Sequence, residues 1–216
     1  IPEKLTSITI TGGTRIPNSA FYGMSSLKTI NIPNTITSIG DYAFYGCSSM
    51  ESSTLPSELT YIGNYAFYGC NSAKFGALTI PNTVTLIGNY AFANCNGLIS
   101  VTVPGSVKTI GQYAFSGCTS LKTAVIKNGV ESIGVRTFSD CTALESLTLP
   151  YAGLSESKIE ENSYPLYAQL FNYSTVEGTY NADSYGIPKK LTSITITGGT
   201  RIPNSAFYGM SSLKTI

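Results

Sequence analysis

The segment ITSIGDYAFYGCSSM, residues 36–50, decides the fold of this chain, because variants of it return at an almost constant spacing. An Ile-Gly pair, a phenylalanine and a cysteine keep their places in every copy. A period of this size predicts stacked structural units, here called rungs. The other copies are LTYIGNYAFYGCNSA (59–73), VTLIGNYAFANCNGL (84–98), VKTIGQYAFSGCTSL (107–121) and VESIGVRTFSDCTAL (130–144).

The repeated phenylalanines and cysteines are the predicted core. The phenylalanines are 23 residues apart, except for 25 residues between Phe67 and Phe92, where Phe75 and Gly76 are the predicted insertion. Roughly six inward apolar side chains per rung, at about 1.5–3 kcal/mol each, cannot offset the ordering of roughly 23 residues at about 1–2 kcal/mol each. Stability must therefore come from stacking of neighbouring rungs. The predicted structural core comprises Phe21, Phe44, Phe67, Phe92, Phe115, Phe138, Cys47, Cys70, Cys95, Cys118 and Cys141.

The cysteines are predicted to be free, buried thiols. Parallel strands lie about 4.8 Å apart, and side chains in line along them keep their Cβ atoms near that distance. This exceeds the roughly 3.5–4.5 Å that a disulfide prefers.

Each rung is predicted to contain one short parallel β-strand. In LKTINIP, residues 27–33, Ile30 and Ile32 share one face while Thr29 and Asn31 share the other. A proline then ends the strand, because it has no N–H to donate. The glycine of the Ile-Gly pair is predicted to take a positive φ and turn the chain. The prolines are Pro33, Pro56, Pro81, Pro104 and Pro150, and the glycines are Gly40, Gly63, Gly88, Gly111 and Gly134.

The pattern LxxIxIPxxVxxIGxxAFxxCxxL resembles the BspA-like, or Treponema-type, leucine-rich repeat. The resemblance covers residues 1–149 and 187–216. It implies a right-handed leucine-rich-repeat solenoid with little helix. Because this repeat occurs in surface proteins of gut and oral anaerobes and of trichomonads, the resemblance also implies an extracellular or cell-surface location and a role in adhesion.

A second, longer period is visible in the sequence. Residues 1–30 recur as residues 187–216, with Lys189 in place of Glu3 as the single change. This gives a period of 186 residues and predicts a longer tandem array. The predicted organisation is regular rungs over residues 1–149, an irregular tyrosine-rich insertion over residues 150–186, and the start of the next block over residues 187–216.

The composition argues against several classes of function. The chain has no histidine, so the commonest general base and metal ligand is missing, and its five cysteines form no CxxC pair. A formal net charge of +1 gives no electrostatic reason to bind nucleic acid. No apolar run is long enough to span a bilayer. We therefore expect no enzymatic activity, no cofactor, no metal, no nucleic-acid binding and no membrane insertion.

Tyrosines are the candidate partner-binding residues. One set lies two residues before the phenylalanine and a second set lies one residue after it, so that each set should form a partly outward-facing column. Aromatic rings with polar tips suit protein contacts, although tyrosine can also simply cover the outer edge of a rung. The candidates are Tyr42, Tyr65, Tyr90 and Tyr113 in the first set, Tyr22, Tyr45, Tyr68 and Tyr208 in the second, and Tyr151, Tyr164, Tyr167, Tyr173, Tyr180 and Tyr185 in the insertion.

Two further surfaces are open to more than one interpretation. The outward strand positions carry a ladder of Ser and Thr, for which β-propensity is a sufficient reason, although ice-binding solenoids share the feature. The insertion can be a binding loop, with a Ca²⁺ site at Glu156, Glu160, Glu161 and Asp183 as a conceivable addition, or a degenerate rung anchored by Phe171.

Two functions are consistent with these observations. The first is a scaffold that binds host matrix proteins or bacterial surface proteins. The alternative is a structural fibre, in which 186-residue blocks stack head to tail on further copies of themselves.

Overall fold

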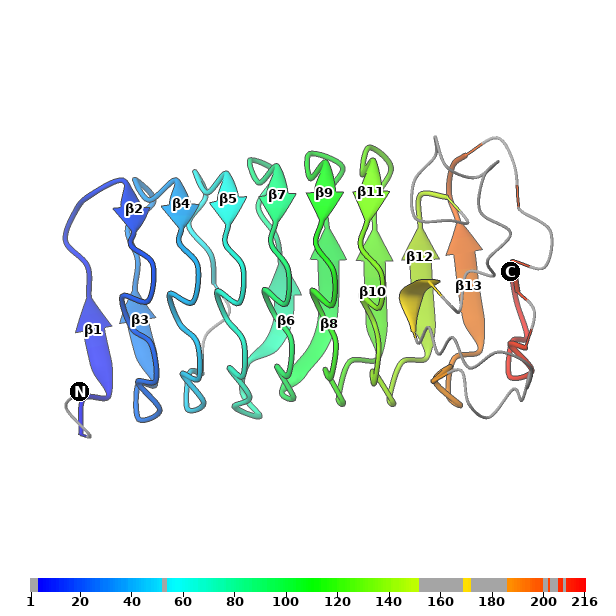
Figure 1. Ribbon diagram of the computed structural model, residues 1–216, viewed down its shortest axis with the longest axis horizontal. Helices are drawn as coiled ribbons and strands as arrows, with labels where there is room; N and C mark the ends of the chain where they lie inside the picture. Colours follow the sequence, from blue (N-terminus) through cyan, green and yellow to red (C-terminus); the bar gives the residue numbers. More distant parts are fainter. Residues whose placement is uncertain are drawn as a thin grey trace.

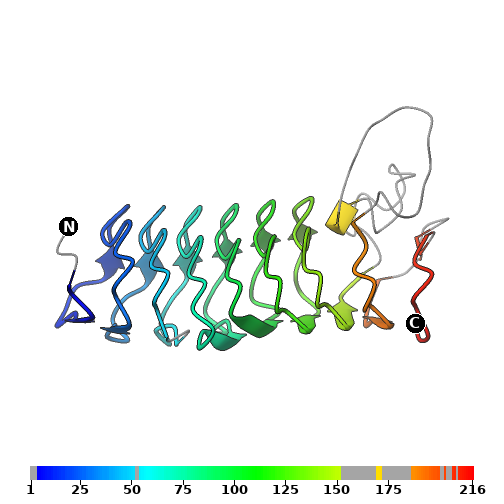
Figure 2. The ribbon, with the colours of Figure 1, turned by 90° about the horizontal axis from the view of Figure 1, so that it is seen from below.

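The computed structural model of the chain is an elongated solenoid, whose rungs stack in a single row along its long axis (Figure 1 and Figure 2). The parallel strands, the spacing of about 23 residues and the near absence of helix agree with the sequence analysis. The structure describes residues 4–51, 54–151, 169–171, 186–199, 202, 206–207 and 209–216.

The predicted strand of each rung forms the main sheet. Its order is β13-β12-β10-β8-β6, all pairs are parallel, and a separate parallel pair, β1 with β3, lies at the N-terminal end. The bounds are β1 (Ser7–Thr9), β3 (Thr29–Asn31), β6 (Gly76–Thr79), β8 (Leu98–Val103), β10 (Thr123–Ile126), β12 (Ser146–Leu149) and β13 (Ser193–Ile196).

A second parallel sheet, not predicted from the sequence, is built from strands of two residues. In each strand the isoleucine faces the core and its neighbour faces outward. Two residues are too few to produce a recognisable alternation, so only one strand per rung was expected. In sheet order the strands are β11 (Ser132–Ile133), β9 (Thr109–Ile110), β7 (Leu86–Ile87), β5 (Tyr61–Ile62), β4 (Ser38–Ile39) and β2 (Arg15–Ile16).

The core contains the predicted phenylalanine and cysteine columns. Ring centroids of neighbouring phenylalanines are 5.0–5.8 Å apart from Phe21 to Phe138. All five cysteines are free and buried, as predicted. Each thiol donates to the carbonyl of the phenylalanine one rung earlier, as in the 3.3 Å bond from Cys70 Sγ to Phe44 O. Cysteine therefore recurs because it fills the core and satisfies a backbone acceptor.

The glycine of the Ile-Gly pair has a different role from the predicted one. None of Gly40, Gly63, Gly88, Gly111 and Gly134 has a positive φ. Instead, a Cβ on Gly63 would lie 2.6 Å from both Asp41 N and Gly40 C of the preceding rung. Glycine is needed here because two backbones approach each other too closely for any side chain.

The insertion near Phe75 is absorbed inside the solenoid. Phe75 is buried, and the pairing of β6 with β8 shifts register between Gly76 and Ala77. This β-bulge accommodates the extra residues without interrupting the sheet.

The main sheet continues across the irregular segment. Ser146 of β12 pairs with Ser193 of β13, although residues 147–192 separate them in the sequence. The side chain of Thr197 adds a 2.7 Å hydrogen bond, from its Oγ1 to Asn128 Oδ1. The start of the second block thus stacks directly on the regular rungs.

Candidate functional site

The outer loops of the rungs arrange seven tyrosines in two columns. Each loop follows an Ile-Gly pair, or Ile16-Pro17 in the loop of Tyr22, and has one tyrosine position two residues before the phenylalanine and a second directly after it. We define column A as Tyr42, Tyr65, Tyr90 and Tyr113, and column B as Tyr22, Tyr45 and Tyr68. Together these seven residues form the tyrosine surface.

Within each column the rings are stacked face to face. Column A has centroid separations of 4.9, 4.7 and 4.5 Å and interplanar angles of 4–6°. Column B has separations of 4.8 Å at both steps and angles of 3°. Most ring faces are therefore occupied by neighbouring rings. The ring edges and hydroxyl groups are left for contact with other molecules.

The two columns also touch each other. Tyr42 and Tyr45 have centroids 5.9 Å apart and planes tilted by 47°, and Tyr65 and Tyr68 repeat this arrangement at 5.7 Å and 49°. These contacts, which the sequence spacing did not predict, join the seven rings into one aromatic surface.

Column A is held by an unusual backbone conformation. Its four tyrosines have φ values of 55–58°, in the left-handed region. This conformation costs about 1–2 kcal/mol for a residue with a side chain. Each of these residues compensates with a backbone hydrogen bond, such as the 2.8 Å bond from Tyr65 N to Asn89 O of the next rung. This conformation could not be predicted from the sequence, because tyrosine has no preference for positive φ.

The loops form a ladder of backbone hydrogen bonds with one direction. Tyr42, Phe44 and Gly46 donate to Asn64, Ala66 and Tyr68 of the next rung, at 2.9, 2.7 and 2.7 Å. Tyr42 and Gly46 have a positive φ, whereas the residues between them have a negative φ. This pattern turns the N–H groups of Tyr42, Phe44 and Gly46 toward the same neighbouring rung. We call this arrangement the loop ladder. It sets the spacing of the tyrosine rings.

Residues 169–171 close the loop ladder at its C-terminal end. The N–H groups of Arg136 and Phe138 donate to Gln169 O and Leu170 O, at 2.6 and 2.9 Å. Leu170 and Phe171 are fully buried. These contacts agree with the interpretation of this part of the insertion as a degenerate rung anchored by Phe171.

A second ladder of side chains fixes the start of each loop. Asp41 N donates to Asn18 Oδ1 at 3.0 Å, Asn64 N to Asp41 Oδ1 at 2.7 Å, and Asn89 N to Asn64 Oδ1 at 2.8 Å. For this reason, the residue before Tyr42, Tyr65 and Tyr90 of column A is Asp or Asn. The regular Asn-Tyr and Asp-Tyr pairs in the sequence were the available signal.

Polar side chains end both columns on their C-terminal side. Asn94 Nδ2 donates to the Tyr68 hydroxyl at 2.7 Å. Arg136 Nη1 donates to the Tyr113 hydroxyl at 2.7 Å, and its guanidinium carbon lies 5.6 Å from the centre of the Tyr113 ring. At the other end, Tyr22 and Tyr42 are 47% and 38% exposed.

The pKa is raised at three tyrosines of the surface, Tyr45, Tyr65 and Tyr90. Burial raises the pKa of Tyr45, and the neighbouring Tyr68 and Tyr22 raise it further. The pKa values of Tyr65 and Tyr90 are raised for the same reasons, although Arg136 opposes the effect at Tyr90. The hydroxyl groups of Tyr45, Tyr65 and Tyr90 therefore act as uncharged donors and acceptors at neutral pH.

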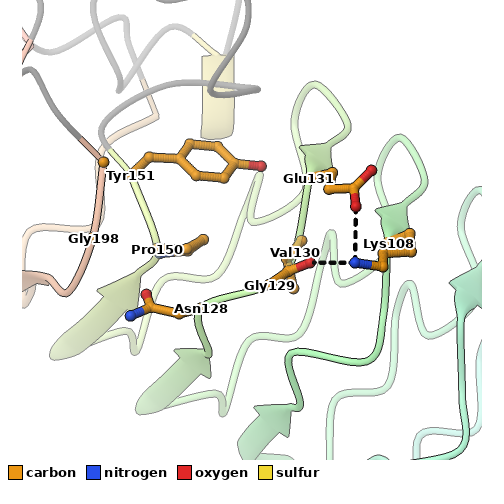
Figure 3. Close-up of a pocket in the computed structure, with 9 residues that line it drawn as sticks. Lys108, Asn128, Gly129, Val130, Glu131, Pro150, Tyr151 and Gly198 are labelled. Atoms are coloured by element: carbon orange, nitrogen blue, oxygen red, sulfur yellow. Dashed lines mark hydrogen bonds and ion pairs between the residues drawn. The ribbon is translucent and has the colours of Figure 1, made fainter.

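Tyr151 is the one remaining candidate tyrosine among the described residues. Tyr151 is only 3% exposed and lines a pocket of about 690 Å³, whose wall includes Gly198 (Figure 3). On the opposite wall Lys108 Nζ forms an ion pair with Glu131 Oε1 at 2.8 Å. Tyr164, Tyr167, Tyr173, Tyr180, Tyr185 and Tyr208, and the carboxylates Glu156, Glu160, Glu161 and Asp183, lie outside the described residues.

The hydroxyl ladder is present on the main sheet. Register aligns Ser100, Thr123, Ser146 and Ser193 across β8, β10, β12 and β13. A second row of aligned residues contains Thr79, Thr102, Val125, Thr148 and Thr195. Because valine replaces threonine without disturbing the strand, β-propensity is a sufficient reason for this ladder.

The described residues contain little that suggests chemistry. Burial raises the pKa of the Cys47 and Cys118 thiols to about 12, which makes them poor nucleophiles. Within the described ranges, no group of three or more Cys, Asp and Glu side chains is placed to hold a metal ion. No helix in the described part of the chain is long and apolar enough to cross a membrane.

Comparison with known proteins agrees with this architecture. The family model described as "BspA type Leucine rich repeat region" matches in six copies, over residues 2–75 and 71–165. The solved structure of the T. pallidum leucine-rich repeat protein is 26% identical with a TM-score of 0.55, and the match covers 65% of this chain and 78% of that one. A Bacteroides ovatus leucine-rich repeat protein is 25% identical with a TM-score of 0.55, covering 98% of this chain and 66% of that one.

A further likeness concerns the fold alone. A leucine-rich repeat protein of Eubacterium ventriosum is 20% identical with a TM-score of 0.55, and the match covers 84% of this chain and 47% of that chain. This chain thus spans less than two thirds of the Bacteroides ovatus and Eubacterium ventriosum proteins. A search of curated proteins finds no match.

Proposed function

Because this chain belongs to the family of BspA-type leucine-rich repeat proteins, we propose that it is a cell-surface or secreted scaffold that binds other proteins through its tyrosine surface. Leucine-rich repeat scaffolds typically serve protein–protein interaction. The family's occurrence in surface proteins of anaerobes supports the location. Host matrix proteins and bacterial surface proteins are the partners that this location would make available.

The observation that carries the proposal is the continuous tyrosine surface. Its rings are fixed in place by stacking, so little side-chain entropy remains to be lost on binding. Its hydroxyl groups are arranged at the spacing of the rungs, which suits hydrogen bonding to a polar partner.

A pair of matched variants tests the binding role. Tyr45→Ala with Tyr65→Ala removes the centre of the tyrosine surface, whereas Thr102→Ala with Thr148→Ala alters the outward face of the main sheet. Binding to immobilised collagen and fibronectin would be measured by surface plasmon resonance, with folding checked by circular dichroism. We expect about tenfold weaker binding for the tyrosine variant alone, which corresponds to about 1.4 kcal/mol. Equal binding by both variants would remove the tyrosine surface from consideration.

The location needs its own test. Protease treatment of intact cells, followed by detection with an antibody against the chain, would degrade a surface-exposed protein and spare an internal one. Full protection, with degradation after cell lysis, would contradict the proposed location.

A structural role in a long array is the second candidate. What supports it is the direct stacking of β13 on β12, together with the bridge between Ser193 and Thr215 that repeats the pairing of Ser7 with Thr29.

Electron microscopy separates the two functions. Under the structural hypothesis, negative-stain images of the native protein show filaments with a constant axial repeat. Discrete particles that bind matrix proteins would exclude the filament and support the scaffold.

A further inference from the structure

The tyrosine surface is also a network of rings in mutual contact. Tyr45 contacts Tyr22, Tyr68 and Tyr42, and Tyr65 contacts Tyr42, Tyr90 and Tyr68. A further contact joins Tyr90 to Tyr113. Every member of the surface is thus connected to every other through centroid separations of 4.5–5.9 Å.

From this geometry we propose that the tyrosine surface is a site of oxidative cross-linking, at which hydrogen peroxide and a haem peroxidase couple neighbouring tyrosines into dityrosine. The proposal rests on the ring contacts and not on the proposed binding function. Bonds within a column would tie adjacent rungs together covalently, which the buried free cysteines do not do, whereas a bond between the columns would link two positions of one loop.

The reaction balances without a further reagent. Two tyrosines each lose one electron to the peroxidase and one phenolic proton to water, and the resulting neutral radicals join through ring carbons next to the hydroxyl groups. The hydrogens on those carbons then move to the phenolic oxygens. Hydrogen peroxide takes up the electrons and protons and becomes two molecules of water. The protein loses two hydrogen atoms for each bond formed.

Most competing reductants among the described residues are absent or sheltered, with the half-buried Met24 as the exception. The sequence contains no tryptophan, whose indole is oxidised more easily than a phenol. The five thiols are 0% exposed, and burial raises the pKa of each of them, so thiolate is not available to quench a tyrosyl radical. Met50 is also buried, at 1% exposure. One-electron oxidation is therefore directed to tyrosine.

The exposed end of the network is where coupling should concentrate. Tyr22 and Tyr42 offer the most ring surface to an external oxidant. At the other end, the positive Arg136 guanidinium lies 5.6 Å from the Tyr113 ring centre and disfavours removal of an electron there. Tyr42 and Tyr45 are neighbours across the columns with tilted planes, the relation that a twisted biaryl bond requires.

The test uses the whole chain at low concentration with hydrogen peroxide and horseradish peroxidase. Dityrosine would be followed by its blue fluorescence, and linked peptides would be mapped by mass spectrometry. The variant Tyr45→Phe with Tyr65→Phe keeps rings in place but leaves Tyr90–Tyr113 as the one tyrosine contact of the surface. The control, Tyr61→Phe with Tyr151→Phe, removes two tyrosines from outside the surface.

We expect the wild-type chain and the control to form dityrosine while remaining monomeric on denaturing gels, with links mapped among residues 22–68. The variant Tyr45→Phe with Tyr65→Phe should form at least roughly fivefold less dityrosine, because six of the seven contacts between tyrosines are lost. Equal yields from the two variants, links confined to residues 152–185, or exclusively intermolecular dimers would each overturn the proposal.

Discussion

The main sheet and the loop ladder solve the same problem of joining one rung to the next in different ways. The main sheet uses ordinary parallel strands, in which Ser, Thr or Val can occupy the outward positions. The loop ladder uses left-handed residues, and the N–H groups that join its rungs belong to the earlier rung. Strands therefore tolerate substitution of their outward residues, whereas the loops require particular side chains at particular places.

This difference predicts where the solenoid is most sensitive. Side chains on the main sheet contribute mainly through propensity and partial burial. In the loops, the backbone approaches the neighbouring rung so closely that the addition of one carbon atom matters.

The largest effect is expected at the close approach before the loop. Gly63→Ala places a Cβ 2.6 Å from backbone atoms of Asp41 and Gly40, so we expect a loss of about 3 kcal/mol in the free energy of unfolding. Gly12→Ala is the matched control, since nothing lies within 4 Å of its added carbon. Urea titration of both variants measures the difference. Similar stabilities would mean that the rungs can separate at little cost.

A second effect concerns how stability depends on pH, and it tests a buried thiol in the core beneath the loops. Burial raises the pKa of Cys118 from an ordinary value of 9.0 to about 12. A raised thiol pKa gives stability that is complete below pH 9 and is lost as the pH rises toward 12. The slope is about 1.4 kcal/mol per pH unit for each thiol.

Comparison of Cys118→Ala with the wild-type chain isolates this slope. The variant should be less stable at pH 7 because a core atom is missing, but its stability should fall less steeply between pH 9 and pH 11. Tyrosine ionisation acts equally on both proteins and cancels in the comparison. Parallel stability curves in urea unfolding at each pH would contradict the buried thiol as the cause.

A smaller effect isolates the left-handed backbone of column A. Tyr65 and Tyr45 each make three ring contacts, but only Tyr65 has a positive φ. Asparagine tolerates this conformation better than tyrosine does. Tyr65→Asn should therefore be less destabilising than Tyr45→Asn by about 1 kcal/mol. Thermal unfolding of the two variants gives the comparison, and the reverse order would argue against strain at Tyr65.

The smallest effect is expected on the main sheet. Thr102→Val places a valine beside Val125, which is already part of the same row of aligned residues. The stability should change by less than about 0.5 kcal/mol. Chemical denaturation is precise enough for this purpose, and a loss above about 1 kcal/mol would show that the hydroxyl groups have a structural role.

Much of the fold was predictable because it depends on periodic apolar residues. Phe67 and Cys70 repeat at the rung spacing, and this places them in the core without further information. The short second sheet was not predictable, since Tyr61–Ile62 is too brief to show alternation. The predicted positive φ at Gly63 was wrong. Glycine is needed there because the backbones of two rungs come close together, and a single sequence does not show this contact.

The candidate site was predictable in position but not in geometry. Regular spacing aligned the tyrosines of columns A and B, and their stacking follows from that alignment. The positive φ of Tyr65 was hidden, because hydrogen bonds to the next rung override its local preference. Whether these tyrosines bind a partner stays a prediction.

The single direction of the loop ladder has an electrical consequence. Its peptide groups between Ser19 and Phe138 point their N–H bonds toward the C-terminal end, so their dipoles add as they do along an α-helix. Among the described residues, the series runs from the loop of Ser19 to the loop of Phe138, where residues 169 and 170 supply the last acceptors. Each stacked rung thus adds to the dipole moment of the loop ladder itself, in a chain with a formal net charge of only +1.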